Sequence, residues 1–227
     1  MSTVKGRVLS VNVGGVREFE YNGRTAKSAI WKSPVDGRVR VRGVNLDGDD
    51  QADRKAHGGP DKAVYAYAIE DLRWWEQQIG RPLGFGEFGE NLTAEGVDVN
   101  DARVGEQWKV GTTLLQVSEP RVPCWRFAVR MNDKYFPRRF TEALRPGAYL
   151  RIITEGGVAA GDEVEVTDRP DHDLTVRDVF RIFSRDRHEA ERLLAVPQVP
   201  ESWRVWADNW LRKAKGHPTD TPAPGCC

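Results

Sequence analysis

The chain has 227 residues, 39% of them hydrophobic, so it can bury a substantial core as one large domain or as a main domain with a small appendage. Lys plus Arg and Asp plus Glu both number 34, and this zero net charge argues against bulk nucleic-acid binding, which needs surplus cations to neutralise phosphates. A secretory signal, a run of the ~20 apolar residues that span a membrane, and a disulfide framework are all missing from the sequence, so we expect a cytoplasmic protein with no membrane contact.

The first half of the chain and the segment before residue 170 consist mostly of short, Val-rich runs separated by turn residues. Asn22-Gly23 is a strong hairpin signal because both residues tolerate positive φ. Asp36-Gly37, Gly111-Thr112 and Gly156-Gly157 indicate further turns. Many short strands joined by glycine turns favour a closed barrel over an open sheet. The expected strands cover residues 4–13, 17–21, 25–32, 39–43, 63–68, 107–110, 113–117, 149–154 and 163–167.

Two helices interrupt the strand pattern. Ile69, Leu72, Trp75 and Ile79 recur at helical spacing on one face, and the following Gly80 is a typical helix end. A shorter helix is predicted over residues 138–144, with a proline just before it, where the missing N–H costs nothing.

The pattern changes after residue 170. Thr175 and Asp178 have capping-box spacing at the start of one predicted helix, and residues 186–196 predict a second. Tryptophans at positions 203, 206 and 210 mark an amphipathic helix that runs to residue 214. Three short helices are too small to be very stable alone, so we expect them to pack on one another and on the barrel. The expected organisation is a barrel domain over residues 1–170, a three-helix module over 171–214 and a disordered tail over 215–227.

Residues 84–89 match the glycine pattern G-x-G-x-x-G of dinucleotide-binding proteins. That pattern binds a pyrophosphate only between a strand and the start of a helix, and here a predicted helix precedes it. We therefore expect no NAD site. The four histidines lie far apart and no C-x₂-C pair is present, so a zinc site is not expected either.

Three other segments carry residues suited to binding. Lys55, His57 and Lys62 surround a Gly-Gly-Pro turn, whose backbone amides and cations suit a phosphate or another oxyanion. The alternative, a solvated turn before a strand, is equally compatible with the residues alone. Glu90 and Asn91 follow a glycine, and an amide that both donates and accepts suits the edge of a heterocycle. A simple turn is the alternative there.

Cys124 is the third candidate. Two prolines, at positions 120 and 123, stiffen its approach, and Arg121 supplies a positive field that favours the thiolate, the form that binds metals. A helical turn that began at Trp125 would add to this field. The alternative is an inert buried cysteine, the commoner fate of a lone Cys.

In this order, the three segments resemble the MOSC domain, a family named from the C-terminal part of molybdenum cofactor sulfurases, and within it the YiiM-like group. The segments are Lys55–Ala63, Phe88–Leu92 and Pro120–Cys124. The resemblance covers roughly residues 20–168, and the three predicted C-terminal helices match the extra module of that group. It implies a mixed α/β, β-rich fold built on a pyruvate-kinase-like β-barrel.

The resemblance also implies a function. Cys124 would be the cysteine that binds molybdenum directly, as a soft thiolate ligand, or that carries sulfur in sulfurase relatives. Basic groups would hold the phosphate of a molybdopterin cofactor, and acid and amide groups its pterin ring, an assignment that we make by chemistry. The residues expected to line this groove are Lys55, His57, Lys62, Glu90, Asn91 and Arg121.

Relatives in this group reduce N-hydroxylated compounds, including N-hydroxylated purine bases, with electrons from a separate redox partner. No flavin or haem motif is visible in the sequence, so the electrons would come from outside. Three alternatives stay open: persulfide sulfur transfer through Cys124, a non-catalytic carrier of the cofactor, and a barrel with no cofactor at all.

Overall fold

The computed structural model describes residues 5–52 and 58–216, so two of the predicted site residues, Lys55 and His57, lie outside the described part of the chain. Seven strands form a closed barrel in the order β13-β9-β10-β11-β7-β8-β1, which the pairing of β1 with β13 completes. The strands are β1 (Lys5–Val13), β7 (Val64–Ala68), β8 (Leu92–Glu95), β9 (Gln107–Val110), β10 (Thr113–Pro120), β11 (Ala148–Thr154) and β13 (Glu163–Asp168). The predicted β-barrel is thereby confirmed.

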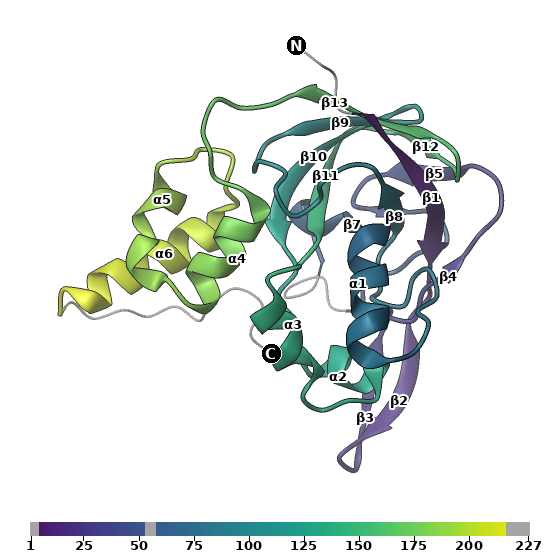
Figure 1. Ribbon diagram of the computed structural model, residues 1–227, viewed down its shortest axis with the longest axis horizontal. Helices are drawn as coiled ribbons and strands as arrows, with labels where there is room; N and C mark the ends of the chain where they lie inside the picture. The colour runs from purple at the N-terminus through teal and green to yellow at the C-terminus, as the bar shows by residue number, and fades with distance from the viewer. Residues whose placement is uncertain (1–4, 53–57, 217–227) are drawn as a thin grey trace.

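All neighbouring strands of the barrel are antiparallel except β7 and β8, which are parallel. A parallel pair needs a crossover connection, and helix α1 (Ile69–Ile79) supplies it on the outside of the barrel (Figure 1). Alternate residues of β7 therefore face two different cores. Val64 and Ala66 point into the aliphatic barrel interior, whereas Tyr65 and Tyr67 point outward into an aromatic cluster.

Six smaller strands are described outside the barrel, and of these only β4 pairs with a barrel strand. The predicted hairpin forms from β2 (Arg17–Tyr21) and β3 (Arg24–Ser28), with positive φ at Asn22 and Gly23. A short β4 (Ser33–Pro34) pairs with the end of β1, so the expected strand over residues 25–32 stops at Ser28. The other small sheet contains β5 (Val39–Arg42), β6 (Asn45–Leu46) and β12 (Gly156–Val158).

The prediction of a turn at Gly156-Gly157 is wrong, because these residues form β12 and pair with β5. Their glycines serve close approach instead. A Cβ atom on Gly156 would lie 2.4 Å from the carbonyl oxygen of Thr112, so only glycine lets the two backbones meet there.

The aromatic cluster on the outer face of β7 is covered by α1 and by two short helices, α2 (Trp125–Met131) and α3 (Phe136–Ala143). Helix α1 contains the four apolar residues predicted for it and ends, as predicted, at a left-handed Gly80. Helix α3 begins two residues before the predicted start, because Pro137 occupies a first-turn position within the helix. Trp75, Phe88, Phe127 and Phe140 are almost fully buried between these helices and the barrel.

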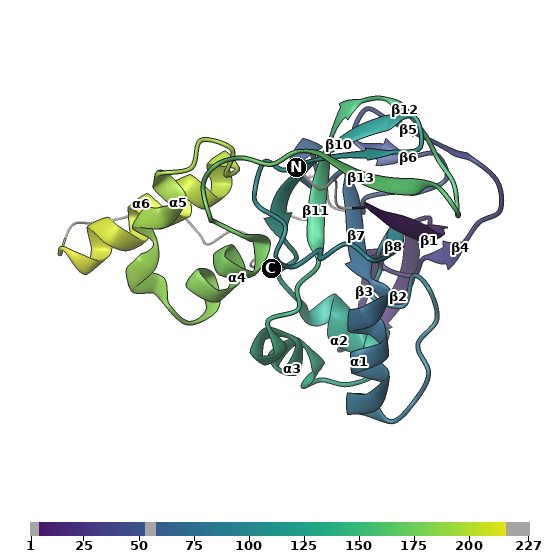
Figure 2. The ribbon, with the colours of Figure 1, turned by 45° about the horizontal axis from the view of Figure 1, so that its top comes forward.

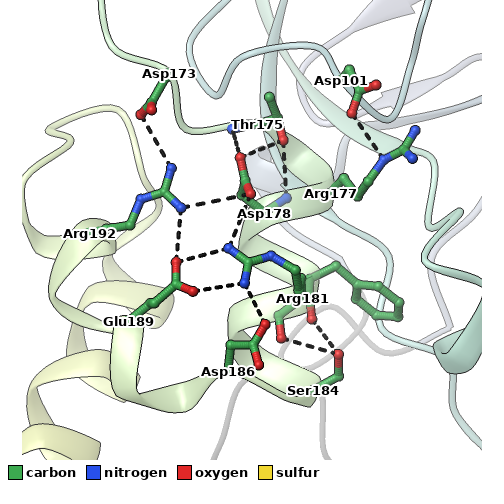
Figure 3. A network of polar contacts seen from close by, with 11 residues as sticks. Asp101, Asp173, Thr175, Arg177, Asp178, Arg181, Ser184, Asp186, Glu189 and Arg192 are labelled. Atoms are coloured by element: carbon green, nitrogen blue, oxygen red, sulfur yellow. Dashed lines mark hydrogen bonds and ion pairs between the residues drawn. The ribbon is translucent and has the colours of Figure 1, made fainter.

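The C-terminal helices are α4 (Val176–Ser184), α5 (Glu191–Leu194) and α6 (Glu201–Ala214), with a 3-10 turn η2 (Arg187–Glu189) before α5. The predicted capping box is present between Thr175 and Asp178. The single helix expected over residues 186–196 is wrong, since η2 and α5 divide it. Arg181 bonds to both Asp186 and Glu189 and so fixes this turn against α4 (Figure 3).

These helices pack on one another around Leu193 and Trp203, and α4 contacts β10 of the barrel (Figure 2). Within the described ranges, no helix has both the length and the apolar character that a bilayer span requires.

Candidate functional site

A row of polar side chains crosses the outer face of the barrel. The strand register places Glu119 of β10 opposite Tyr149 of β11, and Tyr149 opposite Tyr65 of β7. Asn91 continues the row, because its N–H donates to the carbonyl of Tyr65 at 2.8 Å. Side chains alternate between the two faces of a sheet, so the register that fills the barrel interior with aliphatic residues also places this polar row on the outside.

A cavity of about 110 Å³ lies over this row. Four of the predicted site residues line it, namely Lys62, Asn91, Arg121 and Cys124. The fold therefore brings together groups that are up to 62 positions apart in the sequence. Tyr65 and Tyr149 form part of the same wall, and their rings are 4.9 Å apart between centroids.

Cys124 lies at the position where the chain turns from an extended segment into α2. Its backbone is extended, with φ −123° and ψ 177°, and its carbonyl accepts the N–H of Phe127 at 3.0 Å. Helix α2 does begin at Trp125, which is the condition under which its N-terminus adds to the positive field at Cys124. The thiol is partly exposed, lines the cavity and is free of any disulfide.

Arg121 is a buried cation that lines the same cavity as this thiol. The residue is 6% exposed, its guanidinium lies 3.8 Å from the centre of the Phe127 ring, and its Nη1 donates to the carbonyl of Phe88 at 2.9 Å. No acidic side chain of the described chain forms an ion pair with it. Buried charges are normally paired with a counter-charge, so among the described residues this guanidinium is a positive charge at the cavity wall without a carboxylate partner.

Lys62 is held differently. Its Nζ lies 2.9 Å from a carboxylate oxygen of Glu119, which is only 2% exposed. Burial lowers the pKa of the Lys62 ammonium, but Glu119, together with smaller contributions from Tyr149 and Asp61, outweighs this effect, so the pKa lies above its ordinary value. Burial in turn raises the pKa of the Glu119 carboxyl. The positive charge of Lys62 is thus already balanced inside the protein.

Asn91 and Glu90 differ in their relation to the cavity. The Oδ1 atom of Asn91 accepts the N–H of Tyr65 at 3.0 Å, and its Nδ2 donates to Asp49 at 2.9 Å. Glu90 is fully buried and is not part of the cavity wall. Its carboxylate accepts the N–H of Gly86 at 2.6 Å and that of Phe88 at 3.0 Å. Glu90 therefore holds the turn that presents Phe88 and Gly89 to the cavity.

Sequence reasoning missed a buried ion pair in the same wall, formed by Lys32 and Asp49. Asp49 also accepts the N–H of Gly14 at 2.9 Å and the side-chain N–H of Asn91. Burial lowers the pKa of the Lys32 ammonium, although Asp49 opposes the change. The acidic pair Asp49-Asp50, just before the Lys55–Lys62 segment, was the available signal. Lys32, between a short strand and a loop, gave none.

Within the described residues, no group of three or more His, Cys, Asp or Glu side chains is arranged to hold a metal ion. The fold and the site together define a class: a small closed barrel with an added helical module and an outer cavity that carries a thiol beside a buried guanidinium.

Comparisons with known proteins place this class in a family. The model of the MOSC domain matches residues 53–165. The uncharacterized protein YflK of Bacillus subtilis is 35% identical over 87% of this chain and 91% of its own length. The crystal structure of YiiM from Geobacillus stearothermophilus superposes with a TM-score of 0.75 at 29% identity, covering 91% of this chain and 99% of that one. A protein named Reductase from Gibberella moniliformis is 30% identical over 84% of this chain, which spans 34% of that longer protein.

The chain belongs to the MOSC domain family and to its YiiM-like branch, as the sequence motifs predicted. This family is associated with binding of the molybdenum cofactor.

Proposed function

We propose that the protein binds a molybdenum cofactor in the cavity beside Cys124 and reduces N-hydroxylated compounds, such as N-hydroxylated purine bases, with electrons from a separate donor protein. The observation that carries this proposal is that one cavity is lined both by a thiol and by the buried guanidinium of Arg121, which has no carboxylate partner among the described residues. A thiolate is a soft metal ligand, and a buried guanidinium suits the phosphate that a pterin cofactor carries. The name of the Gibberella relative supports a reductase.

The residues present fit such a cofactor unevenly. Cys124 would hold the metal, and Arg121 would hold the phosphate or another anionic group. Lys62 lines the cavity but shares its charge with Glu119, so its contribution to anion binding would be weaker. Asn91 and Glu90 already have internal hydrogen-bond partners, so we assign them to shaping the wall rather than to direct contact with the pterin ring.

When bound, the cofactor would supply the two-electron chemistry of the reduction. The balance is R–NHOH plus two electrons and two protons, giving R–NH₂ and water. The protein's own residues would orient the ligands and exclude competing reactions. Tyr65 and Tyr149 narrow the cavity on one side, and burial raises the pKa of both hydroxyls. Both tyrosines would therefore stay protonated at neutral pH and would not compete with a bound anion.

The first test is the metal content of protein made in a host that synthesises the cofactor and is supplied with molybdate. We expect close to one molybdenum atom per chain after gel filtration. A content below about a tenth of that value would overturn the proposal.

The second test compares reduction of an N-hydroxylated purine by wild type and by Cys124→Ser, with a viologen reduced by dithionite as the donor. We expect the activity to be lost in Cys124→Ser and retained in a Cys226→Ser, Cys227→Ser control, which leaves Cys124 as the only thiol. Equal activity in Cys124→Ser would remove the thiol from the mechanism. Bound molybdenum without reduction would indicate a carrier, and cyanide-labile sulfur on Cys124 would indicate sulfur transfer.

A further inference from the structure

One polar route from the C-terminal helices to the cavity runs through a buried carboxylate. The indole Nε1 of Trp203, on α6, donates to one oxygen of Glu119 at 3.0 Å. The other oxygen of Glu119 forms the ion pair with Lys62 at 2.9 Å. Trp203 is 1% exposed and Glu119 2% exposed. Glu119 itself does not line the cavity, whereas Lys62 does. Glu119 therefore reaches the cavity wall through its ion pair with Lys62, and its charge also acts on Tyr149.

A second connection runs beside the first. Arg151 of β11 forms an ion pair with Asp61, the residue before Lys62. Both terminal nitrogens of Arg151 donate at 3.1 Å to the carbonyl of Gln198, in the segment that leads into α6. The 3-10 turn η1 (Pro60–Lys62) is thus tied to the C-terminal segment twice, at two adjacent residues.

Burial energetics explain why Trp203 matters to this arrangement. An ionised carboxylate that is removed from water is costly unless its oxygens are hydrogen-bonded. Glu119 has two such partners, one from the cavity wall and one from α6. Without the indole N–H, one oxygen of the buried carboxylate would lose its donor, and the ionised form that pairs with Lys62 would be disfavoured.

We propose that the C-terminal helices set the position and charge of the cavity lysine, and that Glu119 is the positioning residue through which Trp203 acts on Lys62. This proposal rests on the proposed function only for the identity of the anion that Lys62 would meet. Among the described residues, the titratable groups with the largest effect on the pKa of Lys62 are Glu119, Tyr149 and Asp61. The proposal can be tested on the apo-protein, so the result of the test does not depend on whether the protein binds molybdenum.

The experiment measures the titration of Lys62 in the full-length apo-protein, by NMR of ¹³C-methylated lysines, with the Lys62 signal assigned by its loss in Lys62→Arg. In the wild type, the Lys62 signal should titrate above the ordinary lysines. Glu119→Gln keeps the side-chain size but removes the charge, so its Lys62 pKa should shift downward. Trp203→Phe removes only one ring and the N–H donor, and should shift the pKa in the same direction by less.

Trp206→Phe is the matched control, because Trp206 lies on the same helix and in the same core cluster, while its indole has no hydrogen-bond partner within the described chain. It should titrate as the wild type does. If Trp203→Phe does not fold, β-(3-benzothienyl)alanine at position 203 keeps the two-ring shape and replaces N–H with sulfur. A folded variant at position 203 with wild-type Lys62 titration would overturn the role of Trp203. An unchanged Lys62 in Glu119→Gln would overturn the role of Glu119.

Discussion

Replacing Arg121 tests separately what the buried guanidinium contributes to the stability of the fold and what it contributes to ligand binding. Arg121→Met keeps an unbranched apolar side chain, shorter than that of arginine, and removes the guanidinium. The change forfeits a hydrogen bond from a charged donor, worth about 1.5–3 kcal/mol, and a buried cation–π contact with Phe127, worth about 2 kcal/mol. It also removes a desolvation penalty of several kcal/mol for a buried ion that has no carboxylate partner among the described residues. These terms nearly cancel, so we expect the free energy of unfolding to change by less than about 2 kcal/mol.

Arg145→Met is the matched control. Arg145 forms an ion pair with Asp71, whose side chain is 4% exposed, and its guanidinium lies 4.6 Å from the centre of the Trp74 ring. Removal of this partner leaves Asp71 buried without its counter-charge, which typically costs about 3–5 kcal/mol. Urea unfolding of the two apo-variants should therefore rank Arg145→Met as the more damaging change.

Molybdenum loading should rank the same two variants in the opposite order. Per folded molecule, Arg121→Met should lose most of the bound metal, and Arg145→Met should retain it. A loss of more than about 4 kcal/mol of stability in Arg121→Met would show that the lost contacts outweigh the relieved desolvation, and would make Arg121 a structural residue. Full molybdenum content in Arg121→Met would show that Arg121 does not take part in binding the cofactor.

Three further predictions concern the scaffold. Gly86→Ala should lower the free energy of unfolding, measured by urea denaturation, by at least about 1–2 kcal/mol. The reason is that φ is 78° at Gly86 and that a Cβ atom there would lie 2.8 Å from the carbonyl oxygen of Lys32. The control Gly84→Ala, where a Cβ atom would meet open space, should be nearly neutral. Thr175→Ala removes the capping box of α4 and should cost about 1 kcal/mol in the same assay. Hydrogen bonds from Arg181 and then Arg192 lower the pKa of the Glu189 carboxyl to about 2 (Figure 3). The contribution of Glu189 is therefore complete above its unfolded-state pKa of 4.5 and is lost as the pH falls towards about 2. The stability difference between wild type and Glu189→Gln, measured at pH 6, 4 and 2.5, should shrink with falling pH, and a constant difference would show that the network does not depend on this charge.

Local signals in the sequence were sufficient for most individual elements. Asn22-Gly23 specifies its hairpin, the four apolar residues of α1 specify the face that it buries, and Thr175 with Asp178 marks the start of α4, because each of these patterns acts within a few residues. The break between η2 and α5 was not predictable in this way. The break depends on the side chain of Arg181, in the preceding helix α4, which binds Asp186 and Glu189.

The candidate site was predictable only in part, for a related reason. Motifs in sequence order pointed to Lys62, Asn91, Arg121 and Cys124, which the fold does bring to one cavity. Tyr65 and Tyr149 could not be found from local patterns, because they join the cavity through cross-strand register. Glu90 shows the opposite case: its motif is local, yet its carboxylate faces backbone amides of its own turn rather than the cavity.

The pairing of charges determines what this cavity can attract. Lys32 and Lys62 both line the wall, but each is balanced by a buried carboxylate, Asp49 and Glu119 respectively. A lysine that is already paired can donate hydrogen bonds to a ligand, but it adds little net positive charge. Arg121 can provide both hydrogen bonds and net positive charge, in the cavity that the thiol of Cys124 lines. Coulombic attraction is strongest where a charge is buried and uncompensated. Under the proposed function, a ligand that carries both an anionic group and a metal centre would therefore place its anionic group at Arg121 and its metal at the thiol of Cys124.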